Sequence, residues 1–297
     1  MLDFRIETFI TVCQYMNFTK AAHALHITQP AVSQQIHYLE EHYQCKLFIQ
    51  QNRKLLLTAA GKALLSASLT MSNDEKKLSA KIQYLNKMNQ PIIFGATLTI
   101  GEYLLPYYIA DYVKTYGDAS LTFFIQDTKT LLKKLDHGDI DFAFVEGYFP
   151  KDDYDYITWK KEKLIPVCSY DHPLLKKDKV TLSDLLSVPL IIREKGSGTR
   201  DTLEHFLACE NISINDFHTT IEVGGVEAIK TLVKLNTGIT FLYESAFSHE
   251  YHHHQLAMIP LVQDFSNEFS FIWRKNSIYS KEYIAFFNML INNKKDT

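Results

Sequence analysis

The sequence predicts an α/β protein in three parts: a small N-terminal helical domain, a long linker helix and a two-lobed α/β domain. Residues 17–43 contain two short helices with a break between them, and residues 57–88 form a long stretch without proline. From residue 92 onward, short apolar strands alternate with amphipathic helices. At 297 residues the chain is long enough for two or three domains. We expect their limits at 1–62, 63–90 and 91–297.

A supporting helix is expected around residues 6–13, and the two short helices after it are expected to begin at threonine side chains. Thr19 is predicted to cap a helix through Ala21, because a cap hydroxyl accepts a hydrogen bond from an otherwise free backbone N–H. Residues 26–27 then interrupt the helix. Thr28 is predicted to cap the second helix, whose Pro30 lies in the first turn, where a missing N–H costs nothing.

The second helix has two unlike faces. Val32, Ile36 and Leu39 recur at spacings of four and three and predict a packing face. The opposite face carries short, polar and uncharged side chains. Such a face suits DNA base edges, since Gln can form hydrogen bonds to adenine and Pro or Ala can touch a thymine methyl. Downstream, residues 46–55 indicate a small β wing whose cations can reach phosphates. The predicted DNA-contacting residues are Thr19, Thr28, Gln29, Pro30, Ala31, Ser33, Gln34, His37, Arg53 and Lys54. The alternative is a helical bundle of no special purpose.

These segments carry a family resemblance. FTKAAHALHITQPAVSQQIHYLE and LTAAGKALL closely resemble the winged helix-turn-helix of LysR-type transcriptional regulators. The chain departs from the pattern after Leu47-Phe48, where the family usually has Glu-Arg and this sequence has Ile49-Gln50. His37 also stands where many members carry Arg. Both departures affect expected contacts to the DNA backbone and leave the docking mode unchanged.

The linker helix carries a stripe that predicts pairing. Leu78, Ile82 and Leu85 recur at spacings of four and three, as a helix-pairing seam would, although the same stripe also fits an ordinary core. The resemblance implies that this helix forms the contact of a dimer. Residues 89–91 (Asn-Gln-Pro) are expected to end it.

The α/β part is expected to have largely parallel sheets divided between two lobes. Lobe I takes residues 91–162 and 266–297, and lobe II takes residues 163–265. The chain would cross between them near 161–164 and again near 264–268. Such a pair resembles the periplasmic-binding-protein-like effector domain of the LysR-type family, with a ligand cleft between its lobes.

The loops that follow strands suggest the chemistry of that cleft. Open α/β sheets bind ligands beyond the carboxyl ends of their strands, and helix starts favour anions. Two arginines beside the most glycine-rich loop can add bidentate donors for an oxyanion. The predicted effector-binding residues are Thr97, Thr99, Thr128, Glu146, Gly147, Arg193, Gly196, Ser197, Gly198, Thr199 and Arg200.

Several of these residues also have a structural interpretation. Each threonine fits a helix cap as well as it fits a ligand contact. Glu146 fits a hinge or an electrostatic gate, since a bare carboxylate would repel an anion. Arg193 fits an ion pair with Glu146 or Glu194.

The loop REKGSGTR lacks the spacing of a nucleotide-binding P-loop. It resembles the REpGSGTR element in the LysR-type branch that serves sulfur and carbon assimilation, and GATLTIGEYLLP, GDIDFAFVEG and GVEAIK match the same branch. The resemblance implies a small anionic effector, such as a sulfur oxyanion, a short carboxylate or a phosphoester. Residues 224–226 read Gly-Gly-Val where relatives usually carry Gly-Ser-Thr, so two hydroxyls are missing and the relatives' effector does not transfer directly.

Composition narrows the class of protein further. The net charge is −3, with +2 in residues 1–62 and −5 in the remainder, so the predicted DNA-binding part is mildly cationic. The four cysteines lack a C-x-x-C spacing and are expected to be reduced thiols. The histidines at 249 and 252–254 raise the question of a metal site, but a solvated connection is the favoured interpretation. No catalytic or dinucleotide-binding motif is present. The N-terminus lacks a signal-peptide pattern and no apolar run reaches spanning length, so we expect a cytoplasmic protein.

These observations predict a LysR-type transcriptional regulator that is not an enzyme, needs no cofactor and binds no metal. We expect a homo-oligomer, a tetramer of paired dimers, whose partners are promoter DNA, RNA polymerase and a small anionic metabolite. Effector binding would change DNA bending and transcription through unequal affinity for two arrangements. The alternatives are a ligand-independent repressor, or an enzyme or solute-binding module with a DNA anchor. The sequence does not identify the effector or the target genes, or whether the protein activates or represses transcription.

Overall fold

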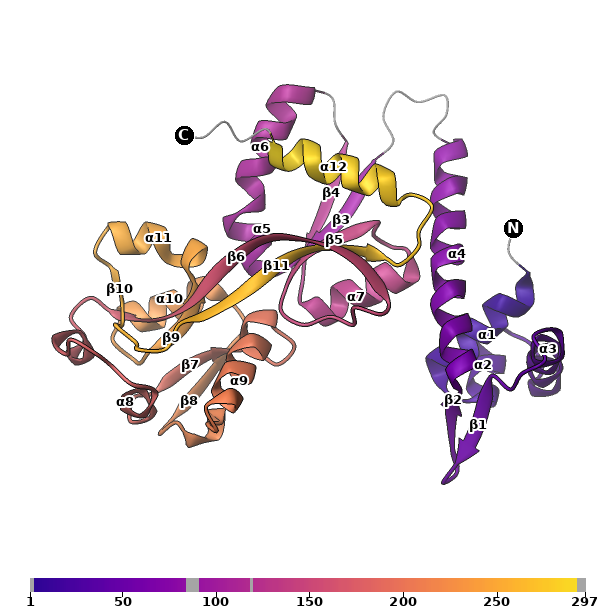
Figure 1. Ribbon diagram of the computed structural model, residues 1–297, viewed down its shortest axis with the longest axis horizontal. Coiled ribbons are helices and arrows are strands. Elements are labelled where there is room, and N and C mark those ends of the chain that lie inside the picture. Colours follow the sequence, from indigo (N-terminus) through magenta and orange to yellow (C-terminus); the bar gives the residue numbers. More distant parts are fainter. Residues whose placement is uncertain (1–2, 84–90, 118–119, 293–297) are drawn as a thin grey trace. The chain divides into compact units, whose positions relative to one another are not determined.

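The computed structural model describes residues 3–83, 91–117 and 120–292. The chain divides into two compact units (Figure 1). The first comprises Met1–Gln90 with Asp136–Asp139 and Arg274–Lys281, and the second comprises Pro91–Leu135, Ile140–Trp273 and Glu282–Thr297.

The first unit begins with three helices, α1 (Phe4–Tyr15), α2 (Phe18–Ala24) and α3 (Gln29–His42). Thr28 caps α3 as predicted, accepting a 3.3 Å hydrogen bond from the N–H of Ala31. The prediction for Thr19 is wrong. Asn17 caps α2 instead, because its extended backbone and its side-chain oxygen, 2.9 Å from the N–H of Lys20, start the helix earlier. Thr19 is therefore an exposed residue inside α2.

The three helices enclose a small core. Val32, Ile36 and Leu39 on α3 are buried, as the spacing predicted, and they pack with Phe9 and Val12 of α1. His26 adopts a left-handed backbone conformation with φ of 56°, which interrupts the helical path between α2 and α3. The core therefore fixes the orientation of α3 and leaves its polar face exposed.

A two-stranded wing follows the helices. Strand β1 (Phe48–Gln51) pairs antiparallel with β2 (Lys54–Leu57). Asn52 and Arg53 between them have φ of 50° and 62°, the left-handed conformations that a tight two-residue hairpin requires. Glu40 at the end of α3 accepts hydrogen bonds from Lys46 Nζ at 2.6 Å and from the N–H of Leu47 at 2.9 Å, and so holds the start of the wing.

Helix α4 runs from Ala59 to Gln83. Leu78 and Ile82 are 45% and 57% exposed, so neither forms part of a core in this chain. Leu85 lies outside the described residues, because residues 84–90 are not described. The predicted helix end at residues 89–91 also falls outside them, except for Pro91. Within the part that is described, no helix is long and apolar enough to cross a membrane.

The second unit is built on a mixed seven-stranded sheet. Its strands are β3 (Ile92–Ala96), β4 (Leu121–Ile125), β5 (Phe142–Glu146), β6 (Tyr154–Ser169), β9 (Thr240–Tyr243), β10 (Leu256–Met258) and β11 (Phe265–Arg274). The order is β10-β6-β11-β5-β3-β4, with β9 also paired to β6. A smaller parallel sheet pairs β7 (Leu190–Arg193) with β8 (Thr220–Val223).

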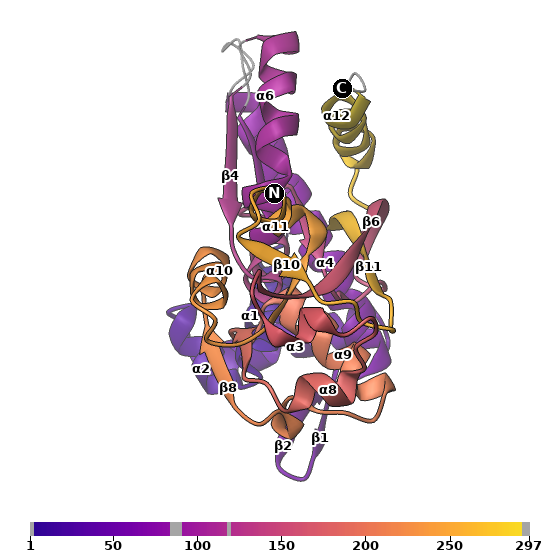
Figure 2. The same ribbon diagram turned by 90° about the vertical axis from the view of Figure 1, so that its left-hand side faces the viewer.

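The expectation of largely parallel sheets is only partly correct. Strand β3 is parallel to β4 and β5, but β5 pairs antiparallel with β11, and β6 pairs antiparallel with β9 and β10. The long strands β6 and β11 are neighbours that run together from one lobe into the other (Figure 1), and they also lie side by side in the turned view (Figure 2). The direction of each strand relative to its neighbours is set by pairing between distant parts of the chain, which local sequence patterns do not encode.

Helices cover both parts of this unit. The helices of the first part are α5 (Leu98–Tyr103), α6 (Leu105–Tyr116), α7 (Thr128–His137) and α12 (Ser280–Asn292). Those of the second are α8 (Leu182–Leu186), α9 (Gly198–Cys209), α10 (Val226–Lys234) and α11 (Glu244–His252), with 3-10 turns at Pro173–Lys176 and Ile214–Asp216. In the first core Phe94 stacks on Phe142, and the tilted ring of Phe286 contacts both; Val167, Ile229 and Phe247 lie in the second core. The fold is therefore a two-lobed α/β unit in which strands β3, β4 and β7 each end shortly before a helix, while β5 leads through a loop to β6.

Candidate functional site

The exposed face of α3 carries most of the predicted DNA-contacting residues. Thr28, Gln29, Pro30, Gln34 and His37 are exposed, while Ala31 and Ser33 are half-buried. Gln29 Nε2 donates a 2.8 Å hydrogen bond to Ser33 Oγ one turn later, so the two side chains form a linked pair on the surface. His37 Nε2 lies 3.1 Å from a carboxylate oxygen of Glu41. The face presents amide, hydroxyl and apolar groups, the types that read base edges.

The cations of the wing lie on its exposed turn. Arg53 and Lys54 are both exposed, at the turn and at the start of β2. Thr19 lies on α2, apart from the cap position that was predicted for it. Ile49, which replaces a family residue next to the wing, is 46% exposed and offers no charge.

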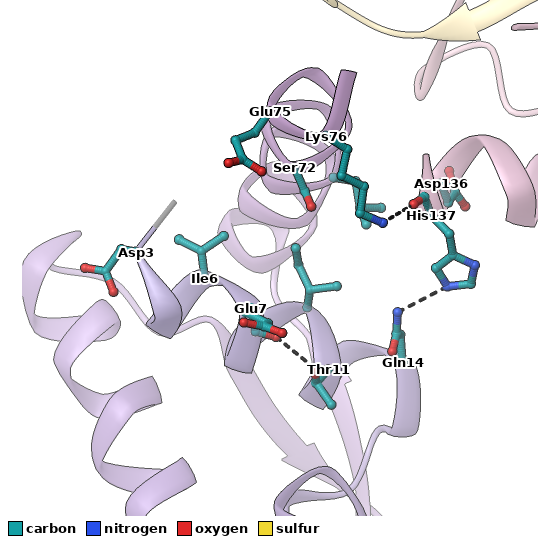
Figure 3. Close-up of a pocket in the computed structure, with 12 residues that line it drawn as sticks. Asp3, Ile6, Glu7, Thr11, Gln14, Ser72, Glu75, Lys76, Asp136 and His137 are labelled. Carbon is teal, nitrogen blue, oxygen red and sulfur yellow. Dashed lines mark hydrogen bonds between the residues drawn. The ribbon is translucent and has the colours of Figure 1, made fainter. Parts of the chain in front are cut away.

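A pocket of about 440 Å³ opens between α1 and α4 in the same unit (Figure 3). Gln14 Nε2 lies 3.2 Å from His137 Nε2, and Lys76 Nζ donates a 2.5 Å hydrogen bond to the carbonyl of His137. Thr11 Oγ1 donates to the carbonyl of Glu7 at 2.8 Å. These polar groups already pair with one another, and none is a predicted site residue.

In the second unit the predicted effector residues converge on Glu146, the last residue of β5. Thr199 Oγ1 at the start of α9 donates to Glu146 Oε1 at 2.7 Å, and Thr99 Oγ1 on α5 donates to the same oxygen at 3.2 Å. The Glu146 N–H donates to Thr97 Oγ1, and Thr128 Oγ1 donates to the Glu146 carbonyl, both at 3.3 Å. All five residues are buried. The sequence therefore folds so that the segments after β3, β4 and β7 all meet at Glu146: Thr99 and Thr199 at its carboxyl group, and Thr97 and Thr128 at its backbone.

Two glycines permit this convergence. A Cβ on Gly198 would lie 2.3 Å from the carbonyl oxygen of Glu146, so only glycine lets α9 start this close to β5. Gly147 has φ of 91°, and a Cβ there would meet the backbone of Gly198 at 3.1 Å. Gly196, with φ of 96°, turns the chain into the same loop.

Burial changes the acidity of Glu146. It raises the pKa of this carboxyl to about 7; hydrogen bonds from Thr199 and Thr99 and the charge of Arg193 act in the opposite direction, and Glu162 adds to the rise. Glu146 is 1% exposed, and its Oε2 has no hydrogen-bond partner. The carboxyl is thus neutral in a large share of molecules at neutral pH.

The two arginines have different partners. Arg193, at the end of β7, donates from Nε and Nη2 to Glu194 at 2.7 Å each, while its buried Nη1 has no partner. Arg200 donates from Nε to Glu204 at 2.7 Å and from Nη1 to Glu222 at 2.6 Å and to the Arg193 carbonyl at 3.0 Å. Arg193 thus keeps a free donor, whereas Nε and Nη1 of Arg200 are engaged within the protein.

The helix-cap interpretation fits only part of this group. Thr97 and Ser197 hold the cap positions of α5 and α9, but neither side chain makes a capping hydrogen bond. Asp127 supplies the corresponding bonds for α7, to the N–H of Thr130 at 2.9 Å and to its hydroxyl at 2.6 Å. The threonines are instead turned toward Glu146.

Sequence reasoning missed the acids that hold Arg200. Glu204 lies one helical turn after Arg200, a spacing that could have indicated the pair. Glu222 lies on β8, and no local pattern indicates its contact with α9.

The histidine run ends a helix. His249 and His252 belong to α11, and the ring of His249 stacks on that of His253 with centroids 4.2 Å apart. In the described parts of the chain no three His, Cys, Asp or Glu side chains are placed to hold a metal ion.

Comparison with known proteins identifies both units. Residues 5–62 match the family model of the bacterial regulatory helix-turn-helix protein, lysR family, and residues 87–294 match that of the LysR substrate binding domain. The HTH-type transcriptional activator CmpR of Synechocystis sp. is 33% identical over 239 residues, which cover 80% of this chain and 77% of CmpR. The RuBisCO operon transcriptional regulator of Acidithiobacillus ferrooxidans is 30% identical over 259 residues, covering 86% and 82%.

A solved structure shares the fold of the second unit. The regulatory domain of Synechocystis PCC6803 CcmR in complex with 2-PG superposes with a TM-score of 0.63 at 19% identity, covering 71% of this chain and 99% of that domain.

A winged helix-turn-helix joined to a two-lobed, substrate-binding-like α/β unit defines a DNA-binding regulator with an effector-binding domain. The chain belongs to the LysR family of transcriptional regulators. The resemblance found in the sequence is confirmed, including the carbon-assimilation side of the predicted branch. The family is one of DNA-binding regulators and not of enzymes.

Proposed function

We propose that the exposed face of α3 reads the bases of an operator while Arg53 and Lys54 contact its phosphates. The linked pair of Gln29 and Ser33 and the neighbouring Gln34 support this, because they form an uncharged hydrogen-bonding face, and the wing cations are exposed in the same unit. In this proposal residues 1–62 bind DNA, residues 63–90 pair two subunits, and residues 91–297 bind the effector.

The effector of this proposal is a small anion bound beside Glu146. One observation carries it: two buried groups, Glu146 Oε2 and Arg193 Nη1, have no hydrogen-bond partner, and Arg193 is close enough for its charge to act on Glu146. Buried polar groups are normally satisfied, so these two point to a ligand that satisfies them. The starts of α7 and α9 add backbone donors that favour negative charge.

Binding there acts on the arrangement of the lobes. The groups around Glu146 come from β5 and α5 on one side and from β7 and α9 on the other, so a ligand that bridges them favours one arrangement. Subunits arranged as a tetramer of paired dimers then change the bend of promoter DNA and the recruitment of RNA polymerase.

Thermal shift measurements on the full-length protein test the effector class. The panel holds sulfite, sulfate, thiosulfate, phosphate, phosphoglycerates, 2-PG and short carboxylates, with glycerol as an uncharged control. An anion should raise the melting temperature, because it binds only the folded form. Ser197→Ala should weaken its binding by about 1 kcal/mol or more through a lost donor, while Ser187→Ala, at an exposed serine after α8, should not.

DNA binding without effector should survive Ser197→Ala, because the two units are separate. A neutral or cationic best ligand, or equal anion binding by both serine variants, would reject the anion site.

A further inference from the structure

An anion site that contains a glutamate presents a conflict of charge. Glu146 lies at the centre of the proposed site and is 1% exposed, so its carboxyl group is shielded from bulk solvent. An ionised Glu146 would repel an anion across a low-dielectric interior, where charge interactions are strong. Arg193 alone does not remove the conflict, because Glu194 already neutralises it through two bonds of 2.7 Å.

The hydrogen bonds of Glu146 are divided unequally between its two oxygens. Oε1 accepts from two hydroxyls, those of Thr199 at 2.7 Å and Thr99 at 3.2 Å. Oε2 is buried and accepts from none. A neutral carboxyl has this asymmetry: its carbonyl oxygen accepts hydrogen bonds, and its other oxygen carries a proton that it can donate.

The charged and titratable groups around Glu146 leave the neutral and ionised forms of its carboxyl group in nearly even balance. From β7, Arg193 favours the ionised form; from β6, Glu162, which pairs with Lys160, favours the neutral form. From β9, the Tyr243 hydroxyl is buried, and the charges of Glu146 and Glu162 help raise its pKa, so it remains protonated. Burial outweighs the hydrogen bonds and raises the pKa of Glu146 to about 7.

We infer that the effector anion binds together with a proton, which Glu146 takes up at Oε2 and donates as a hydrogen bond to the anion. This inference rests on the anion site proposed above. One O–H bond forms on the carboxylate, the proton comes from solvent, and the anion keeps its own charge. The site then offers the anion two donors, the neutral carboxyl of Glu146 and the free Nη1 of Arg193.

Proton uptake selects the kind of effector. An oxyanion accepts both donors, whereas a cation or an amine would require the ionised carboxylate and would expel the proton. Because one proton is taken up for each anion bound to an ionised site, affinity should fall by about tenfold for each pH unit above the pKa of Glu146. The regulator would therefore respond to its metabolite less strongly in alkaline conditions.

Titration calorimetry on the full-length protein tests the coupling. The probes are sulfate, thiosulfate and oxalate, whose own charges do not change between pH 6 and about 9, in two buffers of different ionisation enthalpy that contain no oxyanion. We expect uptake of close to one proton above pH 8 and affinity that falls with pH. Glu146→Gln, a neutral donor of the same shape, should bind with no uptake and a flat pH profile, while Glu210→Gln, on the exposed end of α9, should behave as the parent.

The outcomes separate the two proposals. Anion binding without proton uptake and with the same pH profile in Glu146→Gln would overturn the coupling and leave the anion site standing. If none of the three probes binds at pH 6, the anion site fails and the coupling fails with it. If Glu146→Gln does not fold, the proton count of the parent protein decides the question on its own.

Discussion

Thr199 donates a 2.7 Å hydrogen bond to Glu146 across 53 positions of the sequence. It joins the first turn of α9 to the end of β5, and so ties one lobe of the effector domain to the other. Thr99 reaches the same oxygen from α5 at 3.2 Å. The protonation state of Glu146 is thus linked to contacts between elements of the two lobes. These elements must move relative to each other if the lobes change their arrangement.

The stability of the effector domain should depend on pH through Glu146. Its folded pKa is raised to about 7 from an ordinary value of 4.5, so its contribution is fully present below pH 4.5 and is lost as pH rises through 7. At pH 8.5 the loss amounts to about 3 kcal/mol, since each pKa unit corresponds to roughly 1.4 kcal/mol. Melting curves should show Glu146→Gln gaining stability relative to the parent between pH 5 and 8.5. A constant difference over that range would contradict the raised pKa.

Gly198 should be intolerant of even a methyl group. In Gly198→Ala the new Cβ would lie 2.3 Å from the carbonyl oxygen of Glu146, and backbone cannot yield as a flexible side chain can. We expect a loss of about 1–3 kcal/mol, the usual range for overpacking. Gly225→Ala is the matched control, because nothing lies within 4 Å of its added Cβ and its φ is −129°. Chemical denaturation of both variants measures the difference, and similar losses would show that the approach of α9 to β5 is not a tight contact.

Gln34 and Arg53 should affect DNA binding in different ways. Gln34→Ala should reduce discrimination between operator and random DNA by about 1–3 kcal/mol, the value of a bidentate base contact. Arg53→Ala should weaken binding to both DNAs alike and flatten the salt dependence, because a phosphate contact carries no sequence information. Gel shifts over a range of salt concentrations separate the two effects, with Gln255→Ala in the other unit as a control. The assigned roles are wrong if both substitutions weaken random DNA equally.

The exposed apolar residues of α4 should control assembly. Leu78 and Ile82 are 45% and 57% exposed in the single chain, so Ile82→Asp places a charge in solvent in the monomer but in a contact in the dimer. Light scattering should show a smaller species with its helical content retained. Ser79→Asp, on a neighbouring exposed position of the same helix, should keep the parent mass. An unchanged mass for Ile82→Asp would mean that subunits do not pair through this stripe.

The parts of the fold that follow from local pattern were predictable. The buried face of α3 follows from the spacing of Val32, Ile36 and Leu39, and its start follows from Thr28. Thr19 was misassigned because Asn17, two residues earlier, is a competing cap of similar strength. The directions of β6 and β11 depend on pairing across distant parts of the chain, which periodicity does not reveal.

The candidate site was predictable as a set of loops but not as a set of contacts. Residues that follow strands were expected to gather, and Thr99, Glu146 and Thr199 do so. Of the two partners expected for Arg193, Glu146 or Glu194, the structure shows the ion pair with Glu194. The partners of Arg200 were not predicted, because Glu222 is distant from it in sequence. The free oxygen of Glu146 also depends on burial, which only the folded chain defines. The roles in binding remain predictions.

The two glycines before α10 leave space for a side chain at the start of the helix. Gly225 holds the cap position of α10 in an extended conformation that any residue can adopt, and open space surrounds it. Serine is a good residue at such a position, so Gly225→Ser adds a hydroxyl without strain and strengthens the start of the helix. A hydroxyl can therefore be added at this position at little cost in stability. The neighbouring Gly224 lies close to the partner of Arg193, since a Cβ added there would be 4.0 Å from Glu194 Oε2.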